Sequence, residues 1–575
     1  MSSSVSCTVG ELVADCLYYN GVQTVFGIIS VHNLPIMDGI ARRRELRMVM
    51  TRGETGASHM ADGYARVSGR LGAVVSSTGP GAANTVPGLV EAQFANTPML
   101  HITGQTLTAY VDRNQGTVHD MHDQLGMLRS VSKAAFRIRS VQEALPVLKQ
   151  AILIALTAPC GPVSVEIPID IQRSQAHRRY TPEEFRVPVP PVQQPDEADI
   201  DRLAELVLRA KRPMLRVGRG GLSAGSEVST LMDMGFGLIT SWGGRGVISE
   251  EHPMNFGSLN GVGAPAVEAL YQDVDLMLVV GSGIRSAETL DMKVKMPSNL
   301  VQIDIEPRAD GRTYPTRHFV CGDSAAVLSG LLRRIQGRMA IDPAFIERVK
   351  AVRVQARSEF AKSLGPYESF PDQLRAAMPR DAIFARDITL SNSTWGYRLF
   401  PMYSPRENIY PASSGLGQGV QLAMGAALGA GGSKVIALTG DGGFFFNLAE
   451  LWTAVQEQLD IVFIVMNDKG YGVIKHMQAA MFEGRHRFVD LLGADLMELA
   501  KVAGIPGWRV TQADRFGATV ETALNTRGPA LIEVDMAAIG PFPPYYPHSE
   551  MIARSQQATQ QASATPCPTA AGADR

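Results

Sequence analysis

The chain has 575 residues, which is enough for about three or four domains at about 150 residues each. Hydrophobic residues make up 45% of the chain and charged residues 19%, values that exclude an intrinsically disordered protein. The formal net charge is −2 and no long run of either sign occurs, so neither a nucleic-acid partner nor a basic membrane-binding patch is expected.

The cysteines and the amino-terminal residues indicate the cellular compartment. Five cysteines are scattered without CxxC spacing, which is typical of a reducing compartment and does not indicate a zinc site. Residues 1–21 contain no basic segment followed by an apolar core, and no uninterrupted apolar segment approaches the roughly 20 residues of a membrane-spanning helix. We therefore expect a cytoplasmic protein with no membrane partner.

The first domain is expected over residues 1–186, where predicted helices and strands alternate. Thr8 and Glu11 have the spacing of a Thr-x-x-Glu capping box, which predicts a helix that starts near Thr8. The alternation predicts a doubly wound α/β domain. Its strands are predicted over residues 22–28, 47–51, 72–77, 98–104 and 161–172.

Polar groups near the ends of these strands are candidate functional residues. Glu54 lies in the first turn of the helix that follows the second strand, where a glutamate commonly interacts with the helix dipole. The glycines of residues 78–84 allow backbone amides to approach a ligand or a neighbouring chain. His119 lies in a polar loop, and its imidazole can donate or accept a proton near pH 7. A solvated loop histidine without function is the alternative.

A proline-rich linker over residues 187–198 marks the clearest domain boundary. A central domain is expected over residues 199–335, again with α/β alternation. The glycine-rich segments 218–225 and 281–285 follow strands in this domain, but neither completes GxGxxG. A structural role for these glycines is therefore favoured over a dinucleotide site. The strands are predicted over residues 213–218, 237–243, 276–281 and 300–307.

A charged helical connector is expected over residues 336–369, and a third α/β domain over residues 370–550. Within this domain, Asn447 and Glu450 are predicted to cap a helix. The last residues, 551–575, have low complexity and are expected to be disordered. The strands of the third domain are predicted over residues 382–388, 435–439, 461–466 and 528–536.

Two turns of the third domain carry acidic residues. One strand ends at Gly440-Asp441-Gly442-Gly443, and the next ends at Asn467-Asp468-Lys469-Gly470. A strand-helix-strand unit this short forms a right-handed parallel crossover, so both turns lie at the carboxyl edge of one sheet and the two aspartates come together. Two carboxylates, glycine-freed backbone amides and a helix start make a site for a divalent cation that holds a phosphate group.

This pair of turns resembles the magnesium motif of the thiamine diphosphate (ThDP) enzyme superfamily, in which GDG is followed one helix and one strand later by Asn-Asn or Asn-Asp. The resemblance implies that Asp441 and Asp468 are magnesium ligands, with the Gly470 carbonyl as a third. Many relatives carry asparagine where this chain has Asp468. Since either side chain supplies an oxygen ligand, the departure does not alter the expected metal site.

The resemblance extends to other segments of the third domain. The turn at residues 391–393 resembles the family's diphosphate contacts. In the glycine-rich segment 413–430, the Leu416 side chain is expected to support the angle between the two ThDP rings, and the Gly415 carbonyl to receive the 4′-amino group. A glycine-rich helix start with tight packing is an interpretation that is compatible with this role. The expected cofactor contacts of this domain are Ser391, Asn392, Ser393, Gly415, Leu416, Gly440, Asp441, Gly442, Gly443, Asp468, Gly470, Tyr471 and Gly472.

In the first domain, the sequence TRGETGASHMADGYAR resembles the superfamily's pyrimidine-binding domain, whose glutamate is catalytic. The resemblance implies that the Glu54 carboxyl bonds to the pyrimidine N1′ and drives the 4′-amino group to its imino form. That imine removes the weakly acidic proton of the cofactor's reactive carbon. Together with the two acidic turns, this favours a catalytic Glu54 over a helix-dipole partner. Family members that lack the glutamate, such as glyoxylate carboligase, are poor models.

The Val118-His119-Asp120 triplet occupies a place similar to a Phe-Gln-Glu triplet in acetohydroxyacid synthases and a His-His pair in pyruvate decarboxylases. The resemblance makes His119 a candidate catalytic residue that polarises a substrate oxygen or shuttles a proton. The adjacent histidine pair is absent. Position 77 is serine where benzoylformate decarboxylase has a catalytic histidine. Both departures count against a simple decarboxylase.

The substrate pocket is expected to include residues of the helix that follows Gly470. Relatives line their pockets at the positions of Val473, Ile474 and Met477, which are apolar and suit an aliphatic or aromatic 2-oxo acid. Core packing is an equally open interpretation of these three residues. Residues 539–548 are rich in proline and aromatic residues and can lie across the site. The full expected substrate pocket is Val31, His119, Val473, Ile474 and Met477.

Some relatives bind FAD in the central domain. The flavin-contacting Arg-Phe-Asp-Asp-Arg run of acetohydroxyacid synthases has no counterpart after Gly281, where the sequence is SGIRSAETL. We therefore expect no tightly bound FAD.

The resemblance covers about residues 8–545 as pyrimidine-binding, central Rossmann-like and diphosphate-binding domains, and is greatest to acetolactate synthase-like enzymes. It implies ThDP- and Mg²⁺-dependent decarboxylation of a 2-oxo acid, with carboligation of the enamine to a second carbonyl compound. It also implies a homodimer or homotetramer with active sites at the subunit interface.

Two alternatives stay open. One is a non-oxidative 2-oxo acid decarboxylase that releases an aldehyde. The other is a noncatalytic ThDP-fold binding protein, which the intact Glu54, Asp441 and Asp468 argue against.

Overall fold

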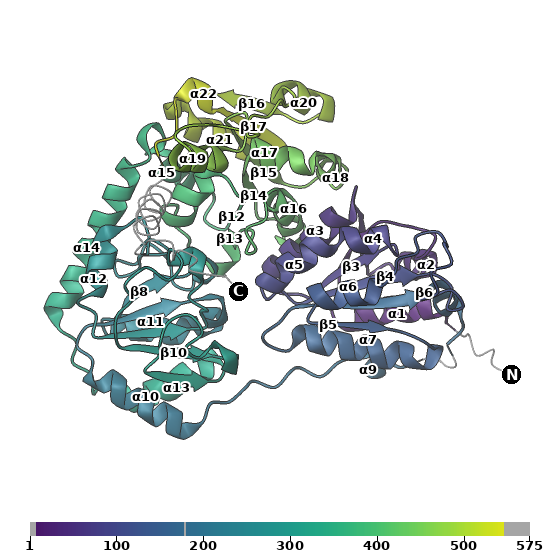
Figure 1. Cartoon of the computed structure of the whole chain (residues 1–575), viewed down its shortest axis with the longest axis horizontal. Helices are drawn as coiled ribbons and strands as arrows, with labels where there is room; N and C mark the ends of the chain where they lie inside the picture. Colours follow the sequence, from purple (N-terminus) through teal and green to yellow (C-terminus); the bar gives the residue numbers. More distant parts are fainter. Residues whose placement is uncertain (1–6, 177–179, 261, 545–575) are drawn as a thin grey trace, which may run out of the picture.

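The computed structural model describes residues 7–176, 180–260 and 262–544, and it divides them into three α/β units (Figure 1). Each unit is built on one sheet whose strand pairings are all parallel, with helices on its faces. The predicted class of three α/β domains is therefore confirmed. The predicted tail over residues 551–575 lies outside the described residues.

The first sheet has six strands in the order β2-β1-β3-β4-β6-β5. The predicted Thr8–Glu11 capping box starts α1 as expected, because each side chain accepts the other residue's backbone amide. The strands are β1 Thr24–Gly27, β2 Arg47–Met50, β3 Gly72–Ser76, β4 Met99–Gln105, β5 Ala134–Arg137 and β6 Pro162–Pro168. The helices are α1 Val9–Tyr19, α2 Leu34–Arg42, α3 Glu54–Ser68, α4 Pro80–Asn84, α5 Val86–Phe94, α6 Gln124–Val131, α7 Val141–Leu156, α8 Ile169–Arg173 and α9 Pro182–Phe185.

The last predicted strand of this domain was too long. Residues 161–172 hold β6 only as far as Pro168, and the remaining residues form α8. The Gln172 side chain explains the change, because its amide donates to the carbonyls of Ile167 (2.7 Å) and His32 (2.8 Å) and so fixes a turn there.

The central sheet has five strands in the order β11-β10-β9-β7-β8. The glycine-rich segments after β7 and β9 pack against each other: the Gly220 amide donates to the Gly281 carbonyl (3.0 Å), and a Cβ on Gly281 would lie 2.2 Å from the Gly220 backbone. The strands are β7 Pro213–Val217, β8 Gly237–Thr240, β9 Leu276–Val280, β10 Leu300–Asp304 and β11 His318–Cys321. The helices are α10 Glu197–Arg209, α11 Gly225–Asp233, α12 Pro265–Tyr271 and α13 Ser324–Ile335, and α14 Pro343–Lys362 forms the connector.

The third sheet has six strands in the order β13-β12-β14-β15-β17-β16. The strands are β12 Ile383–Arg386, β13 Asn408–Ile409, β14 Val435–Gly440, β15 Ile461–Asn467, β16 Gly507–Val510 and β17 Ala530–Asp535. The helices are α15 Phe370–Ala377, α16 Gln418–Gly429, α17 Asp441–Phe446, α18 Leu451–Gln456, α19 Gly472–Met481, α20 Leu496–Ala503, α21 Phe516–Leu524 and α22 Met536–Ile539. β14 and β15 pair in parallel, so the predicted crossover is confirmed.

The predicted helix cap at Asn447 and Glu450 is wrong. Helix α17 begins directly at Asp441, and Asn447 makes no capping hydrogen bond with its side chain. Glu450 instead contacts the first domain, where its carboxylate accepts from the amides of Arg52 and Gly53 at 3.0 Å. The Glu450 side chain thus bonds to another domain instead of capping a helix in its own.

The first and third domains share one hydrophobic core through α3 and α16 (Figure 1). The two helices cross so closely that a Cβ on Gly63 would lie 2.0 Å from the Leu422 carbonyl oxygen. A Cβ on Gly425 would lie 1.9 Å from the Met60 carbonyl oxygen. The glycines of these helices are therefore required for the contact between the two domains.

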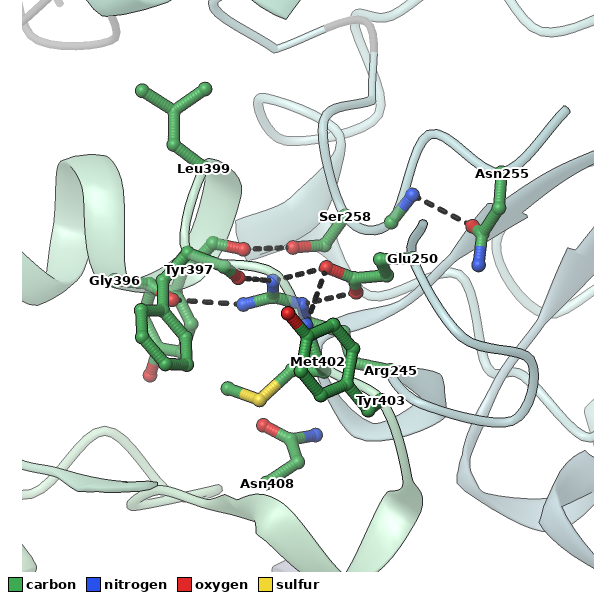
Figure 2. Close-up of polar contacts among 12 residues, drawn as sticks. Arg245, Glu250, Asn255, Ser258, Gly396, Tyr397, Leu399, Met402, Tyr403 and Asn408 are labelled. Carbon is green, nitrogen blue, oxygen red and sulfur yellow. Dashed lines mark hydrogen bonds and ion pairs between the residues drawn. The ribbon is translucent and has the colours of Figure 1, made fainter. Parts of the chain in front are cut away.

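The central domain is joined to the third by a buried ion pair (Figure 2). Arg245 and Glu250 are both almost fully buried and pair at 2.6 Å. Arg245 also donates to the carbonyls of Gly396 (2.8 Å) and Phe400, and the Glu250 carboxylate accepts from the Met402 amide at 3.1 Å. Within the described residues, no helix has the length and apolar character needed to cross a membrane.

Candidate active site

Asp441 and Asp468 lie side by side at the carboxyl edge of the third sheet, as predicted. Asp441 is the first residue of α17 and Asp468 directly follows β15. Burial and the neighbouring Asp441 carboxylate raise the pKa of Asp468 to about 7, and burial also raises the pKa of Asp441. Among the described residues, the buried Oδ1 of Asp441 has no hydrogen-bond partner.

These two carboxylates fit a divalent cation. A buried, unpartnered carboxylate oxygen beside a second carboxylate is unfavourable without a positive charge between them. Among the described residues, no group of three or more His, Cys, Asp or Glu side chains is arranged so that it could hold a metal ion. Mg²⁺ commonly takes one or two carboxylates and completes its shell with phosphate and other oxygens, so the donor set suits a magnesium ion that holds a phosphorylated ligand.

A cavity of ≈ 240 Å³ is lined by Asp468 and by Gly440 and Gly442 on either side of Asp441, although not by Asp441 itself. Its walls come from the ends of β12, β14 and β15, from the start of α19 and from the turn before α16. Eight of the predicted cofactor contacts line it: Leu416, Gly440, Gly442, Gly443, Asp468, Gly470, Tyr471 and Gly472. Ile388, Thr389, Leu390, Ser414 and Met536 also line it and were not predicted.

The turn after β12 is placed differently from the expectation. Ser391, Asn392 and Ser393 do not line the cavity, and Asn392 begins a π-helical turn behind it. The Asn392 side-chain amide donates to the Asp387 carbonyl at 2.7 Å. The residues that face the cavity are the three that precede this turn, at positions 388–390.

Asp387 is a buried carboxylate that supports the Leu416 turn. It accepts from the backbone amides of Gly417 (3.0 Å) and Gly419 (3.2 Å) and from the Thr439 hydroxyl (3.2 Å). Gly417 has φ +80°, a conformation that favours glycine. Burial raises the pKa of Asp387 to about 6. The sequence analysis missed this residue, although an acidic residue directly after a strand at the same sheet edge was a usable signal.

Glu54 is the first residue of α3 and is 9% exposed. The Asn84 side-chain amide donates to its Oε2 at 3.2 Å. A Cβ on Gly81 would lie 2.7 Å from both the Glu54 Oε1 and the Ser77 Cβ, so the glycine-rich turn packs directly on the carboxylate. Glu54 and Ser77 therefore belong to one cluster at the carboxyl edge of the first sheet.

His119 also belongs to this cluster. Its Nδ1 lies 3.2 Å from the Ser77 hydroxyl, which bonds to the Ser30 hydroxyl at 2.7 Å. The His32 ring packs against the His119 ring with centroids 5.1 Å apart. Burial, with a smaller effect of His119, lowers the pKa of His32. Within the described residues, the buried Nδ1 of His32 has no hydrogen-bond partner.

The sequence analysis missed His32 and Ser30. It noted the absence of an adjacent histidine pair, but the fold pairs His119 with a histidine from a distant loop. His32 follows β1, whose carboxyl end lies at the same sheet edge as that of β4, which leads into the His119 loop. The signal that could have identified His32 is its position shortly after a predicted strand, at the sheet edge where the other candidate residues of this domain lie.

The expected substrate-pocket residues separate in the structure. Val473 and Ile474 line the ≈ 240 Å³ cavity, whereas Met477 lines neither this cavity nor the larger one beside it. Val31 is 60% exposed on the first domain, near the His32–His119 pair. The structure thus brings only two of the five expected residues to the cavity.

The larger cavity, of ≈ 650 Å³, adjoins the first through Leu390, Asp468 and Met536. Basic side chains on and around α19 line it, namely Lys469, Lys475, His476 and His486. Pro541, Phe542 and Pro544 of the predicted covering segment also line it, and residues 545–548 of that segment lie outside the described residues. All residues that line the two cavities belong to the third domain. Glu54 and His119 line neither.

Comparison with known proteins agrees with this geometry. Models of the thiamine pyrophosphate enzyme N-terminal, central and C-terminal domains match residues 7–127, 200–331 and 390–534. The chain is 31% identical over 500 residues to the probable 2-ketoarginine decarboxylase AruI of Pseudomonas aeruginosa, covering 86% of each chain.

Two acetolactate synthases are also similar. The chain is 27% identical to the probable acetolactate synthase large subunit of Methanocaldococcus jannaschii, covering 91% of each chain. It is 26% identical to the acetolactate synthase isozyme 2 large subunit of Escherichia coli, covering 94% of this chain and 98% of that one. The chain belongs to the thiamine diphosphate-dependent enzymes, in their acetolactate synthase-like group.

Proposed function

We propose that this enzyme decarboxylates a 2-oxo acid with ThDP and Mg²⁺. The observation that carries the proposal is the pair of buried carboxylates, Asp441 and Asp468, at a cavity lined by Leu416. These aspartates and the Gly470 carbonyl hold the cation, and the backbone amides around Gly442 hold the diphosphate. When bound, ThDP supplies a nucleophilic carbon that also accepts the electron pair left by carbon dioxide.

The chain's own residues bind, orient and transfer protons. Leu416, whose following turn is held by Asp387, would contact the bound cofactor. Glu54, which lies at the start of α3 and accepts a hydrogen bond from Asn84, would hold a proton at the pyrimidine N1′ of bound ThDP. Val473 and Ile474 line the cavity and give it an apolar wall.

We propose that the active site forms between two subunits. Both cavities are lined by the third domain alone, yet Glu54 lies in the first domain, so a cavity of one chain needs the Glu54 of another. Exposed apolar side chains surround both half-sites and indicate surfaces that become buried on assembly. They are Ile29, Val31, Leu34, Leu107, Tyr110 and Val118 on the first domain, and Phe446, Ile474, Met481, Phe482, Phe488 and Leu492 on the third. A homodimer is the minimum assembly and a homotetramer is compatible with it.

We propose release of an aldehyde as the main outcome. Release of an aldehyde would require a proton donor at the active site. The His32–His119 pair, linked through Ser77 to the Glu54 cluster, is such a donor. The similarity to a protein named as a decarboxylase supports this outcome.

Carboligation is the second candidate. The similarity to two acetolactate synthases favours it, and in that case a second carbonyl compound takes the place of the proton. Proton transfer from the histidine pair and reaction with the second carbonyl compound then compete. The histidine pair therefore determines the ratio of aldehyde to ligation product.

The charge around the larger cavity restricts the substrate. Lys469, Lys475, His476 and His486 line it, and Asp468 is the one acidic residue among its lining residues. Burial lowers the pKa of His476, and Lys475 pairs with Asp490 at 3.2 Å, so the positive charge that a cationic side chain such as that of 2-ketoarginine would meet comes mainly from Lys469. We therefore propose a 2-oxo acid with a neutral or anionic side chain.

The test incubates the protein with ThDP and Mg²⁺ and a panel of 2-oxo acids with aliphatic, aromatic, anionic and cationic side chains, with and without an aldehyde acceptor. Carbon dioxide and all products are identified. We expect aldehyde from neutral or anionic substrates. A 2-hydroxyketone or 2-hydroxy acid as the sole product would identify a carboligase, and no carbon dioxide from any donor would identify a noncatalytic protein.

The variants His32→Ala and His119→Ala test the proton donor. Each should lower aldehyde release by about 10²-fold, the usual contribution of a general acid, while the ratio of ligation product to aldehyde rises. His122→Ala is the matched control, because His122 lies in the same loop but contacts the Asn114 side chain rather than Ser77. Unchanged aldehyde release in both variants would refute the role of the pair.

A further inference from the structure

Two buried carboxylates cross the interface between the first and third domains of one chain. Glu450 belongs to the third domain and is 3% exposed, and Glu91 belongs to α5 of the first domain and is fully buried. Each accepts hydrogen bonds from backbone amides of the other domain. The residues that they hold directly precede cofactor-contacting residues.

Glu450 holds the residues before Glu54. Its Oε1 accepts from the backbone amides of Arg52 and Gly53, both at 3.0 Å, and its Oε2 accepts from the Thr453 hydroxyl at 2.7 Å. The carboxylate fits against α3 because residue 56 is a glycine, where a Cβ would lie 2.1 Å from Oε1. An anion at this end of a helix also interacts favourably with the helix dipole.

Glu91 holds the loop before Leu416. Its carboxylate accepts from the backbone amides of Ala412 (2.6 Å) and Ser413 (2.8 Å) of the third domain. Arg66, which is also buried, bonds to Glu91 at 2.6 Å and donates to the Tyr410 carbonyl at 2.7 Å. Asp62 completes the network as the second partner of Arg66.

We propose that Glu450 and Glu91 are a reciprocal pair of positioning residues: Glu450 fixes Glu54 for the pyrimidine end of the cofactor, and Glu91 fixes Gly415 and Leu416 for its central bend. The inference rests on the proposed function for the roles of Glu54 and Leu416. Since Glu54 serves the partner's cavity and Leu416 serves its own, the pair links the two active sites of a dimer through each chain.

The structure also explains why the pair is built from carboxylates. Glu450 uses one oxygen for both amides, whereas Glu91 uses a different oxygen for each of its two amides, so Glu91 needs two acceptor oxygens on one side chain. Burial raises the pKa of Glu450. Burial opposes ionisation of Glu91 as well, but Arg66 and the loop amides outweigh it and lower the pKa of Glu91.

The Glu450 arm is tested with the full chain in three variants. Glu450→Ala removes the acceptor, and Gly56→Ala displaces it from the other side without altering Glu450. Glu450→Gln keeps an oxygen for the two amides and should behave nearly as the wild type. Glu457→Gln is the matched control, because Glu457 also pairs across this interface, with Arg47 at 2.5 Å, but contacts no cofactor-bearing loop.

Two readouts separate positioning from general stability. The hydrogen-exchange rate of the amides at residues 52–54 should rise about ten-fold in Glu450→Ala and Gly56→Ala. Without the hydrogen bonds to Glu450, this segment opens locally more often. With the preferred 2-oxo acid, kcat should fall about ten-fold while KM changes little. The circular-dichroism signal of the imino form of the bound cofactor should fall as well. Thermal unfolding and elution volume confirm that each variant is folded and assembled.

The Glu91 arm has a different signature. Glu91→Gln places an amide donor against other donors and should weaken ThDP binding about ten-fold, since one or two loop hydrogen bonds are lost. Asp62→Asn is its control, because it also alters the Arg66 network but does not touch residues 412–413. Equal weakening in both variants would overturn the role of Glu91.

The outcomes distinguish this inference from the proposed function. If the wild type shows no ThDP-dependent turnover, the proposed function fails, and hydrogen exchange still decides whether Glu450 holds residues 52–54. If the wild type is active but Glu450→Ala and Gly56→Ala match Glu457→Gln in exchange and in kcat, the inference is refuted while the proposed function stands.

Discussion

Asp387 shows how one buried carboxylate shapes the cofactor site without lining it. It lies behind the cavity and fixes the two amides that follow Leu416. Because burial opposes its ionisation and the hydrogen bonds only partly compensate, its pKa rises to about 6. The Leu416 turn is therefore positioned by Asp387, whose ionised form is destabilised by burial.

This raised pKa predicts a pH dependence of stability. A carboxyl whose folded pKa exceeds its unfolded value favours the native state most below the unfolded pKa, near 3.9, and this contribution is lost as the pH rises through about 6. Asp387→Asn removes the titration and can keep the amide contacts through its oxygen. We compare the free energy of unfolding of the variant with that of the wild type at each pH. Above pH 6 this difference should favour the variant by about 1–3 kcal/mol more than it does at pH 4.

Denaturant unfolding of both proteins between pH 4 and pH 8 measures this difference. A constant difference over the whole range would contradict the prediction. Asp381→Asn, which alters an exposed carboxylate just before β12, serves as the control.

At the scale of elements, the crossing of α3 and α16 positions both halves of the site. Gly63 and Gly425 lie where each helix touches the other's backbone carbonyls. A side chain at either position requires the helices to separate, which moves Glu54 at the start of α3 relative to the Leu416 turn before α16.

We therefore expect Gly425→Val to destabilise the protein by about 1–3 kcal/mol, the usual cost of overpacking a buried contact. Thermal unfolding measures this loss. Gly225→Ala, at the start of α11 where a Cβ would lie 3.3 Å from the Val247 carbonyl oxygen, is the control and should change stability by less than about 1 kcal/mol. Equal stability of Gly425→Val and the wild type would show that the close crossing is not required.

The strands that the sequence analysis failed to predict are all at sheet edges. β5, β11, β13 and β16 lie at the edges of the three sheets, and they are short or only partly buried. The central strands are continuous apolar runs buried on both faces and were predicted within a few residues. An edge strand lacks this signal because solvent replaces one neighbour.

The candidate site divides in the same way. The two acidic turns were predictable because a parallel crossover places both at one sheet edge, whatever the rest of the fold. The contacts of Glu450 and the pairing of His32 with His119 were not, because they join segments far apart in the chain. The displacement of Ser391 and Asn392 from the cavity depends on a π-helical turn that no local pattern indicated.

At the scale of the whole molecule, buried charges join the domains. Arg245 and Glu250 fasten the central domain to the third beside the π-helical turn (Figure 2). Removing one partner of such a pair leaves an uncompensated buried charge. We therefore expect Glu250→Ala to lower the free energy of unfolding by about 3–5 kcal/mol.

Differential scanning calorimetry measures this effect. The double variant Arg245→Met/Glu250→Ala should recover part of the loss because no buried charge remains. A single variant as stable as the wild type would contradict the assigned role of the pair. Glu251→Ala, whose partner Arg380 is exposed, should change stability by less than about 1 kcal/mol.

The domains also determine how the active site is completed. The first domain presents Glu54 and the histidine pair, and the third presents the proposed cation and diphosphate site, but neither of the two cavities described above contains both. The shared core through α3 and α16 fixes these two half-sites within a chain. Each half-site is therefore expected to meet its complement on a second chain.

Complementation between two inactive variants tests this account most directly. Glu54→Gln removes the proton-holding group and Asp441→Ala the cation ligand, so each homodimer should be inactive with ThDP, Mg²⁺ and the preferred 2-oxo acid. After the two are mixed and reassembled, each mixed dimer contains one intact site and one doubly altered site. About a quarter of the wild-type activity should then return for random dimers. If no activity returns although mixed dimers are shown to form, the active site is not shared between subunits and the account is wrong.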